Sequence, residues 1–127
     1  MSSIYLLDTP ILVDFLNDIH EAKLLMSDLK PKEIGISVIT YTEALVGIDD
    51  HLQKESLESM IENFFYFSIE KSTAQIAADL KRKYRWKLPD AYQAAIAIEH
   101  KMTLLTRNTK DFNPSVHKFV KIPYKLK

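Results

Sequence analysis

Apolar residues along the chain follow two alternating spacings. Short apolar runs, typical of buried strands, occur at residues 4–7, 34–37, 65–69 and 103–106, with a possible fifth at 119–122. Between these runs, apolar residues recur at helical spacing, which predicts helices over residues 10–16, 20–29, 40–48, 52–65, 72–84 and 90–98. Strands that alternate with helices predict an α/β fold in three layers. Its central, mostly parallel sheet has four to five strands and helices on both faces.

Local signals predict where the helices begin. Thr9 is the expected N-cap of the first helix, with Pro10 at its first position. Ser72 or Thr73 is expected to cap the helix that ends near Tyr84. Leu88-Pro89 is expected to break that helix before Asp90 begins the next one. Thr40 is expected to open the third helix, which would place Glu43 in its first turn.

Length and composition favour a single soluble globular domain over residues 1–127. The chain is 46% hydrophobic and 27% charged, and its apolar runs are far too short to span a bilayer. Met-Ser-Ser leads directly into a strand-like run, so no secretory signal is expected. We therefore expect a cytoplasmic protein without membrane contact.

Two scarce residue types exclude several kinds of chemistry. The absence of cysteine excludes a disulfide framework, a thiolate zinc site and a cysteine nucleophile. The only glycines, Gly35 and Gly47, cannot form a P-loop or a Gly-rich dinucleotide turn. The formal net charge is zero, so any nucleic-acid binding would need a local basic rim.

Four acidic residues, Asp8, Glu43, Asp90 and Asp111, stand where predicted strands and helices end or begin. Ligands of open α/β sheets gather outside the carboxyl ends of the strands, where such side chains would meet. Carboxylates that meet must repel one another unless a cation lies between them. Oxygen ligands without a nearby cysteine suit Mg²⁺ or Mn²⁺. The pattern therefore predicts a small metal-dependent enzyme, with nuclease activity as the leading hypothesis.

Each acid also has a structural interpretation. Position favours a site role for Asp8, because Thr9 already supplies a cap. Glu43 and Asp90 fit equally well as residues that complement or cap a helix N-terminus. The polar segment around Asp111 is, by composition alone, more typical of a turn. The site hypothesis gains strength because all four fall on one plausible rim.

Three motifs carry a resemblance to a known family. They are Leu-Leu-Asp-Thr at the start, Leu-Pro-Asp-Ala before an alanine-rich helix, and Leu-Leu-Thr-Arg-Asn-Thr-Lys-Asp-Phe. Together with the helical Glu43, they resemble the PIN domain and, more narrowly, the VapC toxins of prokaryotic toxin–antitoxin pairs. The likeness covers the whole chain, in order and at about the right length.

The resemblance implies an Mg²⁺- or Mn²⁺-dependent ribonuclease, a protein antitoxin partner, and a homodimer or higher even oligomer. By motif, Asp8, Glu43 and Asp90 match the three most characteristic acids, and Asp111 supplies the fourth. It also implies accessory roles for Thr106, near a ligating carboxylate, and for Asn108. One departure is Pro10, where relatives often carry Asn or Ser.

Basic residues near two of the acids are candidates for RNA contact. Arg107 and Lys110 flank Asp111 and are the stronger candidates for touching phosphate. Residues 81–87, including Arg85 and Lys87, hold five of the 17 Lys and Arg residues. Tyr84 and Trp86, interleaved among them, would offer stacking faces to single-stranded bases. A solvated helix end or an antitoxin-binding surface explains this segment equally well. His20, His51, His100 and His117 are expected on the surface.

Other functions fit parts of the pattern. A non-toxin PIN nuclease that processes RNA would carry the same acids. A catalytically inactive PIN module that binds RNA or protein is disfavoured, because degenerate relatives usually lose acids. A receiver domain would need paired acids after the first strand, yet Asp8 has no acidic neighbour. It would also need a phosphoacceptor Asp after a middle strand, whereas the third run ends in Ser68-Ile69-Glu70.

Overall fold

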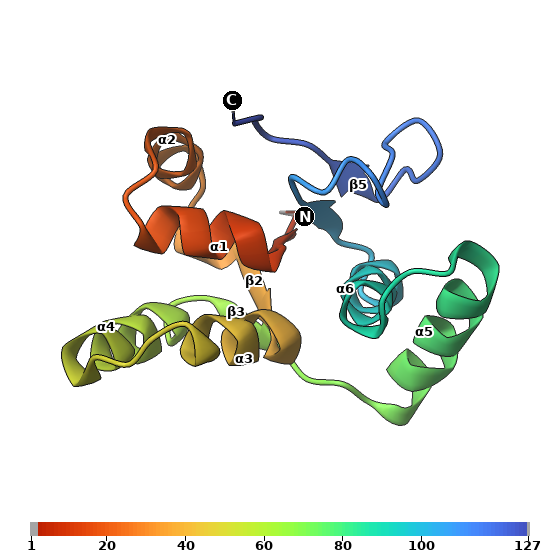
Figure 1. Cartoon of the computed structure of the whole chain (residues 1–127), viewed down its shortest axis with the longest axis horizontal. Coiled ribbons are helices and arrows are strands. Elements are labelled where there is room, and N and C mark those ends of the chain that lie inside the picture. The colour runs from red at the N-terminus through yellow and green to blue at the C-terminus, as the bar shows by residue number, and fades with distance from the viewer. Residues whose placement is uncertain (1–2, 127) are drawn as a thin grey trace.

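The strands form one parallel sheet in a computed structural model that describes residues 3–126 (Figure 1). The strands are β1 (Tyr5–Leu7), β2 (Ile34–Ser37), β3 (Phe65–Phe67), β4 (Thr103–Leu105) and β5 (Val120–Lys121). Their order across the sheet is β3-β2-β1-β4-β5, and each neighbouring pair is parallel. The predicted parallel sheet is confirmed. Since all strands run the same way, their carboxyl ends share one edge.

Helices cover both faces of this sheet. In chain order they are α1 (Thr9–Leu16), α2 (His20–Asp28), α3 (Val38–Val46), α4 (His51–Ile61), α5 (Lys71–Tyr84) and α6 (Leu88–Glu99), with a 3₁₀ turn at Pro31–Glu33. The α/β class and the predicted helices are confirmed, with shifted boundaries. No helix within residues 3–126 is long and apolar enough to cross a membrane.

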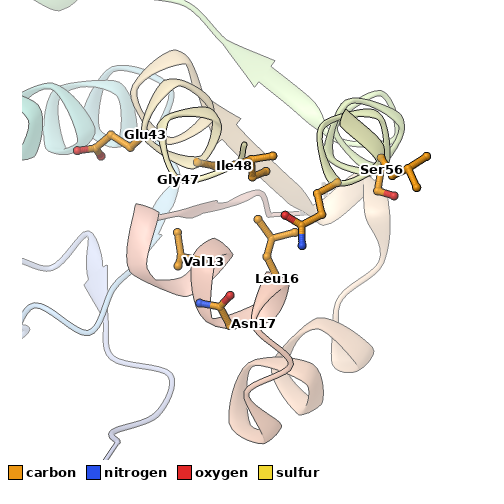
Figure 2. A pocket seen from close by; sticks show the side chains of 10 residues that line it. Val13, Leu16, Asn17, Glu43, Gly47, Ile48 and Ser56 are labelled. Carbon is orange, nitrogen blue, oxygen red and sulfur yellow. The ribbon is translucent and has the colours of Figure 1, made fainter. Parts of the chain in front are cut away.

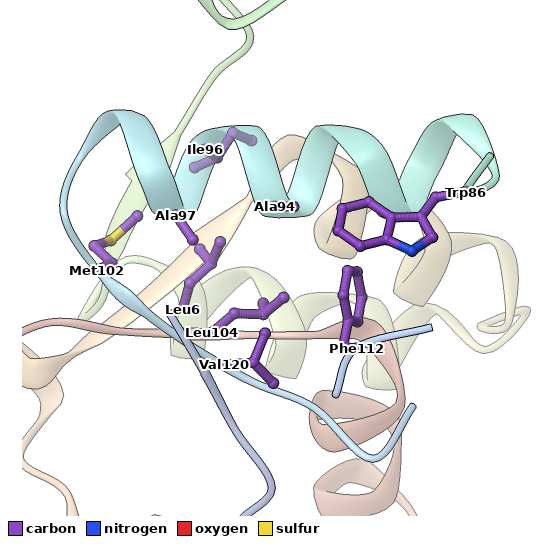
Figure 3. Close-up of a cluster of buried hydrophobic side chains, with 9 residues drawn as sticks. All are labelled: Leu6, Trp86, Ala94, Ile96, Ala97, Met102, Leu104, Phe112 and Val120. Atoms are coloured by element: carbon purple, nitrogen blue, oxygen red, sulfur yellow. The ribbon is translucent and has the colours of Figure 1, made fainter. Parts of the chain in front are cut away.

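Alternating leucines on the central strands divide the core into two clusters. Leu6 and Leu104 pack under α6, together with Trp86, Phe112 and other residues of the same cluster (Figure 3). Leu7 and Leu105 point to the opposite face, where they join residues of α1, α3 and α4. Because successive side chains of a strand point to opposite faces, one short strand can serve two cores. The predicted three layers are confirmed.

Small residues bring α5 and α6 close together. Ala91 and Ala95 of α6 pack against Ala77 of α5, and all three are buried. Ala94 and Ala97 of α6 lie against the sheet instead. The helix is therefore buried on two sides, which also encloses its one buried polar residue, Gln93.

Four of the expected helix starts are wrong. Asp8, and not Thr9, caps α1, because its carboxylate accepts the Thr9 N–H at 3.0 Å. Ser37 caps α3 three residues before Thr40, so Glu43 lies beyond the first turn. The helix α5 begins at Lys71 after Glu70. The helix α6 begins at Leu88, because Pro89 fits a first helical turn and starts this helix.

Two aromatic side chains expected at the surface are buried. Trp86 is 4% exposed and His117 is 8% exposed. The Trp86 ring stacks on Tyr84 at 4.7 Å and meets Phe112 edge-on at 4.8 Å. Trp86 therefore offers no free face to an RNA base, and that expectation is wrong. Its neighbours Arg85 and Lys87 are exposed, whereas the indole lies in the core (Figure 3).

Candidate active site

The four predicted acids converge at the carboxyl edge of the sheet. Asp8 directly follows β1, Glu43 lies on the helix after β2, and Asp111 lies in the loop after β4. Asp90 is in the first turn of α6. The negative charges of Asp8, Asp111 and Glu43 all act on the Asp90 carboxylate. Four carboxylates from residues up to 103 positions apart thus lie close enough to repel one another.

Asp8 is the buried centre of this group, at 4% exposure. Its Oδ1 accepts hydrogen bonds from the Thr9 N–H at 3.0 Å and from the Gln93 amide at 3.1 Å. Its Oδ2 accepts one from the Thr106 hydroxyl at 2.6 Å. Burial raises the pKa of Asp8, while the bonds from Thr106, Gln93 and Thr9 oppose that rise. The donors orient an anion that the core alone would disfavour.

Gln93 is a site residue that the sequence motifs did not reveal. Its amide N–H donates to Thr40 at 2.6 Å as well as to Asp8, and its carbonyl accepts from Ser37 at 2.5 Å. Gln93 thereby links α6 to the start of α3 and to the end of β1. The signal was an amide side chain in the middle of an alanine-rich helix, where a buried amide must find partners.

Glu43 is connected to the other acids by a hydrogen bond from Thr9. The Thr9 hydroxyl donates to Glu43 Oε1 at 2.5 Å, which connects α1 to α3. Glu43 also lines a hollow of about 360 Å³ between α1, α3 and α4. Its carboxylate points away from Leu16 and Ile48, which form the apolar part of that hollow (Figure 2). Glu43 therefore lies at the border between a polar site and an apolar groove.

Asp90 is the acid whose ionisation is most disturbed. Burial, together with repulsion from Asp8, Asp111 and Glu43, raises its pKa from 3.8 to about 6. The positive charge of Lys87 acts in the opposite direction. No side chain within residues 3–126 makes a hydrogen bond to Asp90. Within the described residues Asp90 forms no salt bridge, so Lys87 offsets the repulsion only in part.

The loop after β4 holds the fourth acid by a small set of hydrogen bonds. The Asn108 amide donates to Asp111 Oδ2 at 3.1 Å, and the Asn108 carbonyl accepts the Asp111 N–H at 3.2 Å. The Asn108 N–H donates to the Thr106 hydroxyl at 3.0 Å. Phe112, fully buried, anchors the loop in the core. Thr106 and Asn108 thus connect Asp111 to Asp8.

Arg107 lies in an ion pair that the sequence did not suggest. Its guanidinium Nε and Nη2 donate to Asp14 at 2.6 and 3.1 Å. Tyr124 donates to the same carboxylate at 2.8 Å. Burial and the bond to Asp14 raise the pKa of Tyr124, so its phenol stays protonated. Arg107 retains further N–H donors, and its side chain is 30% exposed. Of the other expected RNA-contact residues, Lys110, Arg85 and Lys87 are exposed.

The donor set fits a hard divalent cation. Asp8, Glu43, Asp90 and Asp111 offer carboxylate oxygens, the ligands that Mg²⁺ and Mn²⁺ prefer. Within residues 3–126, no three acidic, histidine or cysteine side chains lie close enough together to hold a metal ion between them. Mg²⁺ usually keeps several waters and takes one or two carboxylates directly, so an open acidic site suits it. The raised pKa of Asp90 marks where added positive charge would be most stabilising.

Comparisons with known proteins match the fold of the chain. The family model of the PIN domain matches residues 5–113. A chain of a toxin–antitoxin complex from Klebsiella pneumoniae is 34% identical, with a TM-score of 0.88 over 96% of this chain and 99% of that chain. Among curated proteins, none matches the chain.

Two other solved structures share the fold at lower identity. FitAcB from Neisseria gonorrhoeae is 24% identical, with a TM-score of 0.78 over 94% of this chain and 98% of that one. VapBC-1 from nontypeable Haemophilus influenzae is 22% identical, with a TM-score of 0.68 over 89% and 92%. The family-model match, the parallel five-stranded sheet and the convergent acids lead to one conclusion: the chain belongs to the PIN domain family.

Proposed function

We propose that the protein is an Mg²⁺- or Mn²⁺-dependent endoribonuclease that acts as the toxin of a toxin–antitoxin pair. The observation that carries the proposal is the mutual repulsion of four carboxylates, Asp90 with Asp8, Glu43 and Asp111, which Lys87 offsets only in part. Phosphodiester hydrolysis needs an activated water and neutralised phosphate charge. A bound divalent ion supplies both.

Each residue of the site has a role in this proposal. Asp8 and Asp90 would hold the ion directly, with Glu43 and Asp111 binding it directly or through waters. Gln93 and Thr106 keep the oxygens of Asp8 oriented, so that little reorganisation is needed on binding. Asn108 does the same for Asp111. Arg107, Lys110, Arg85 and Lys87 would contact RNA phosphates around this centre.

Support for the toxin role comes from the solved relatives. The structure that is 34% identical is a toxin–antitoxin complex, and this chain covers nearly all of its matching partner. We therefore propose a cognate antitoxin protein as partner. The apolar hollow between α1, α3 and α4 would receive an apolar segment of it beside Glu43 (Figure 2). We further propose a single domain over residues 1–127, a cytoplasmic location, and a homodimer or higher even oligomer.

One experiment tests the enzyme and the toxin together. Purified protein should cleave RNA in Mg²⁺ or Mn²⁺, leaving 5′-phosphate and 3′-hydroxyl ends, and should stop when EDTA removes the ion. Expression alone should arrest bacterial growth, and Asp8→Asn should abolish both effects, because the amide cannot supply the charge that holds the ion. Cleavage that persists in EDTA would sink the metal mechanism. An Asp8→Asn protein as toxic as the parent would refute the role of Asp8.

A further inference from the structure

A second hollow, of about 600 Å³, lies beside the carboxyl end of α5. Its lining comes from Ala78, Lys81, Arg82, Arg85 and Leu88. Residues 78, 81 and 82 follow the spacing i, i+3 and i+4, so they share one face of α5, and Arg85 is the C-cap residue that follows the helix. The small Ala78 leaves room between the long cationic side chains. Leu88, the first residue of α6 and 49% exposed, also lines the hollow.

The charge of this hollow is strongly one-sided. Three of its five lining residues are cations. The Lys81 ammonium is fixed at the rim, because it donates to the Trp86 carbonyl at 2.9 Å. Arg82 contacts Asp79, an exposed partner one helical turn earlier, at 2.7 Å. The Lys83 ammonium instead lies 5.2 Å from the centre of the Tyr84 ring, so it is not part of the hollow. The chain as a whole has no net charge, which makes this concentration a local feature.

The helix dipole favours cations at the carboxyl end of α5 and offsets the repulsion between the like charges gathered there. Arg85 follows the helix in a left-handed conformation with φ of 60°, where glycine is the favoured residue. The backbone therefore does not itself favour a large cationic side chain at position 85.

The hollow is close in sequence to the candidate active site. Leu88 stands two residues before Asp90, and Lys87 lies between Arg85 and the acid. The charge of Lys87 acts on the Asp90 carboxylate, so the two groups are within electrostatic reach. Between residues 80 and 89 the chain carries no acidic residue. The chain between the hollow and Asp90 therefore carries only positive charges.

We propose that this hollow binds the sugar–phosphate backbone of single-stranded RNA next to the cleaved bond. The inference rests on the proposed ribonuclease function and names the surface that holds its substrate. Guanidinium groups such as those of Arg82 and Arg85 bind phosphate oxygens in pairs, which suits them to this ligand. The exposed Leu88 side chain offers apolar surface to a ribose or a base edge.

Binding without cleavage isolates this surface. A fluorescently labelled single-stranded RNA is titrated with the protein in EDTA, at several NaCl concentrations. We expect the double variant Arg82→Ala/Arg85→Ala to bind about tenfold more weakly at low salt. The slope of log K against log salt should fall by roughly 0.7 for each phosphate that the variant no longer neutralises. Lys54→Ala, an exposed lysine on α4, is the matched control and should keep the parent slope.

Further variants separate charge from folding. The pair Arg82→Lys/Arg85→Lys keeps the charge and should retain most of the salt slope. Arg85→Gly suits the left-handed backbone, so weaker RNA binding with an unchanged melting temperature would support the proposal. Parent-like affinity and slope in the double alanine variant would overturn it. The same titration is repeated with labelled poly-glutamate. If the double alanine variant loses poly-glutamate binding but keeps parent-like RNA binding, the proposal is also overturned, in favour of an acidic protein partner.

The outcomes distinguish this inference from the proposed function. If the double alanine variant binds RNA like the parent and the parent cleaves RNA in an EDTA-sensitive way, only the proposed role of the hollow is overturned. If RNA binding depends on the hollow but the protein never cleaves RNA, the proposed ribonuclease function is overturned and the hollow is supported as an RNA-binding surface.

Discussion

The Asp8 carboxylate caps α1 and also receives hydrogen bonds from Gln93 and Thr106. Capping and site roles are usually weighed as alternatives, yet one oxygen here accepts both the Thr9 N–H and the Gln93 amide. The helix start places the acid at the strand end, and the cap fixes its rotation. A capping acid at the carboxyl edge of a parallel sheet is therefore compatible with a catalytic role.

Asp90 should make the protein without metal less stable as pH rises. Its folded pKa is about 6 against an ordinary 3.8, so the folded state holds the proton more tightly. That stabilisation is present in full below pH 3.8 and is lost as pH passes through 6. Asp90→Asn removes the loss, so in EDTA at pH 7 the variant should be more stable by about 1–2 kcal/mol. This figure already includes a reduction for solvent screening, because the Asp90 carboxylate is only half buried.

Thermal melts in EDTA across this pH range check the sign, and melts with Mg²⁺ check the metal. The parent should gain melting temperature with Mg²⁺, and Asp90→Asn should not. A variant that melts lower than the parent in EDTA, yet gains as much from Mg²⁺, would show that Asp90 is only a structural first-turn residue.

Gln93→Ala should lower the free energy of unfolding by about 2–4 kcal/mol. The change leaves the buried Ser37 and Thr40 hydroxyls without their amide partner and removes a donor from Asp8. Urea unfolding measures the loss. Gln75→Ala, on the exposed face of α5, is the control and should change stability little. Equal effects in the two variants would contradict the role of the buried amide.

At the level of elements, the hydrophobic pattern predicted each strand and helix but not where the helices start. Apolar spacing is a property of a whole segment, whereas a helix start depends on which oxygen reaches which N–H. Asp8 displaced Thr9 as the cap of α1, and Ser37 began α3 before Thr40. The sequence could place Asp8, Asp90 and Asp111 near one another because each follows a strand or lies in a first helical turn, whereas Glu43 lies beyond the first turn of α3.

The residues that pattern reasoning missed depend on tertiary contacts. Gln93 and Asp14 are polar residues inside helices, and nothing in their spacing shows which distant partner buries them. Trp86 lies among charged residues, which made a core side chain resemble a surface one. His117 sits in a polar stretch, yet it packs against Tyr84 and Trp86.

A hydrogen bond from the Tyr124 phenol joins the segment after β5 to α1. Tyr124→Phe removes the hydrogen bond to Asp14 at 2.8 Å and should cost about 1–2 kcal/mol, because the acceptor is charged. Asp14→Ala should cost more, since Arg107 then loses its bidentate partner. Chemical denaturation compares the two. Equal losses would mean that the phenol alone carries the attachment.

For the molecule as a whole, strand order explains why distant acids meet. The strand β1 lies at the centre, with β2 and β4 on either side. The chain leaves each of these three strands at the same edge, toward α1, α3 and the loop that carries Asp111. The helix α6 crosses one face and brings Asp90 and Gln93 to that edge. No short segment contains the site, so its geometry depends on the complete fold.

The single tryptophan also makes the protein its own optical probe. Trp86 is buried four residues before Asp90, and its ring contacts Phe112, the neighbour of Asp111. An ion that draws these two acids together should therefore alter the indole emission, which a Mg²⁺ titration above neutral pH would record without any label. Asp111→Asn should keep the blue-shifted emission of a buried indole and lose the response. The occupancy of the catalytic centre could then be followed in real time, in the presence of RNA or a partner protein.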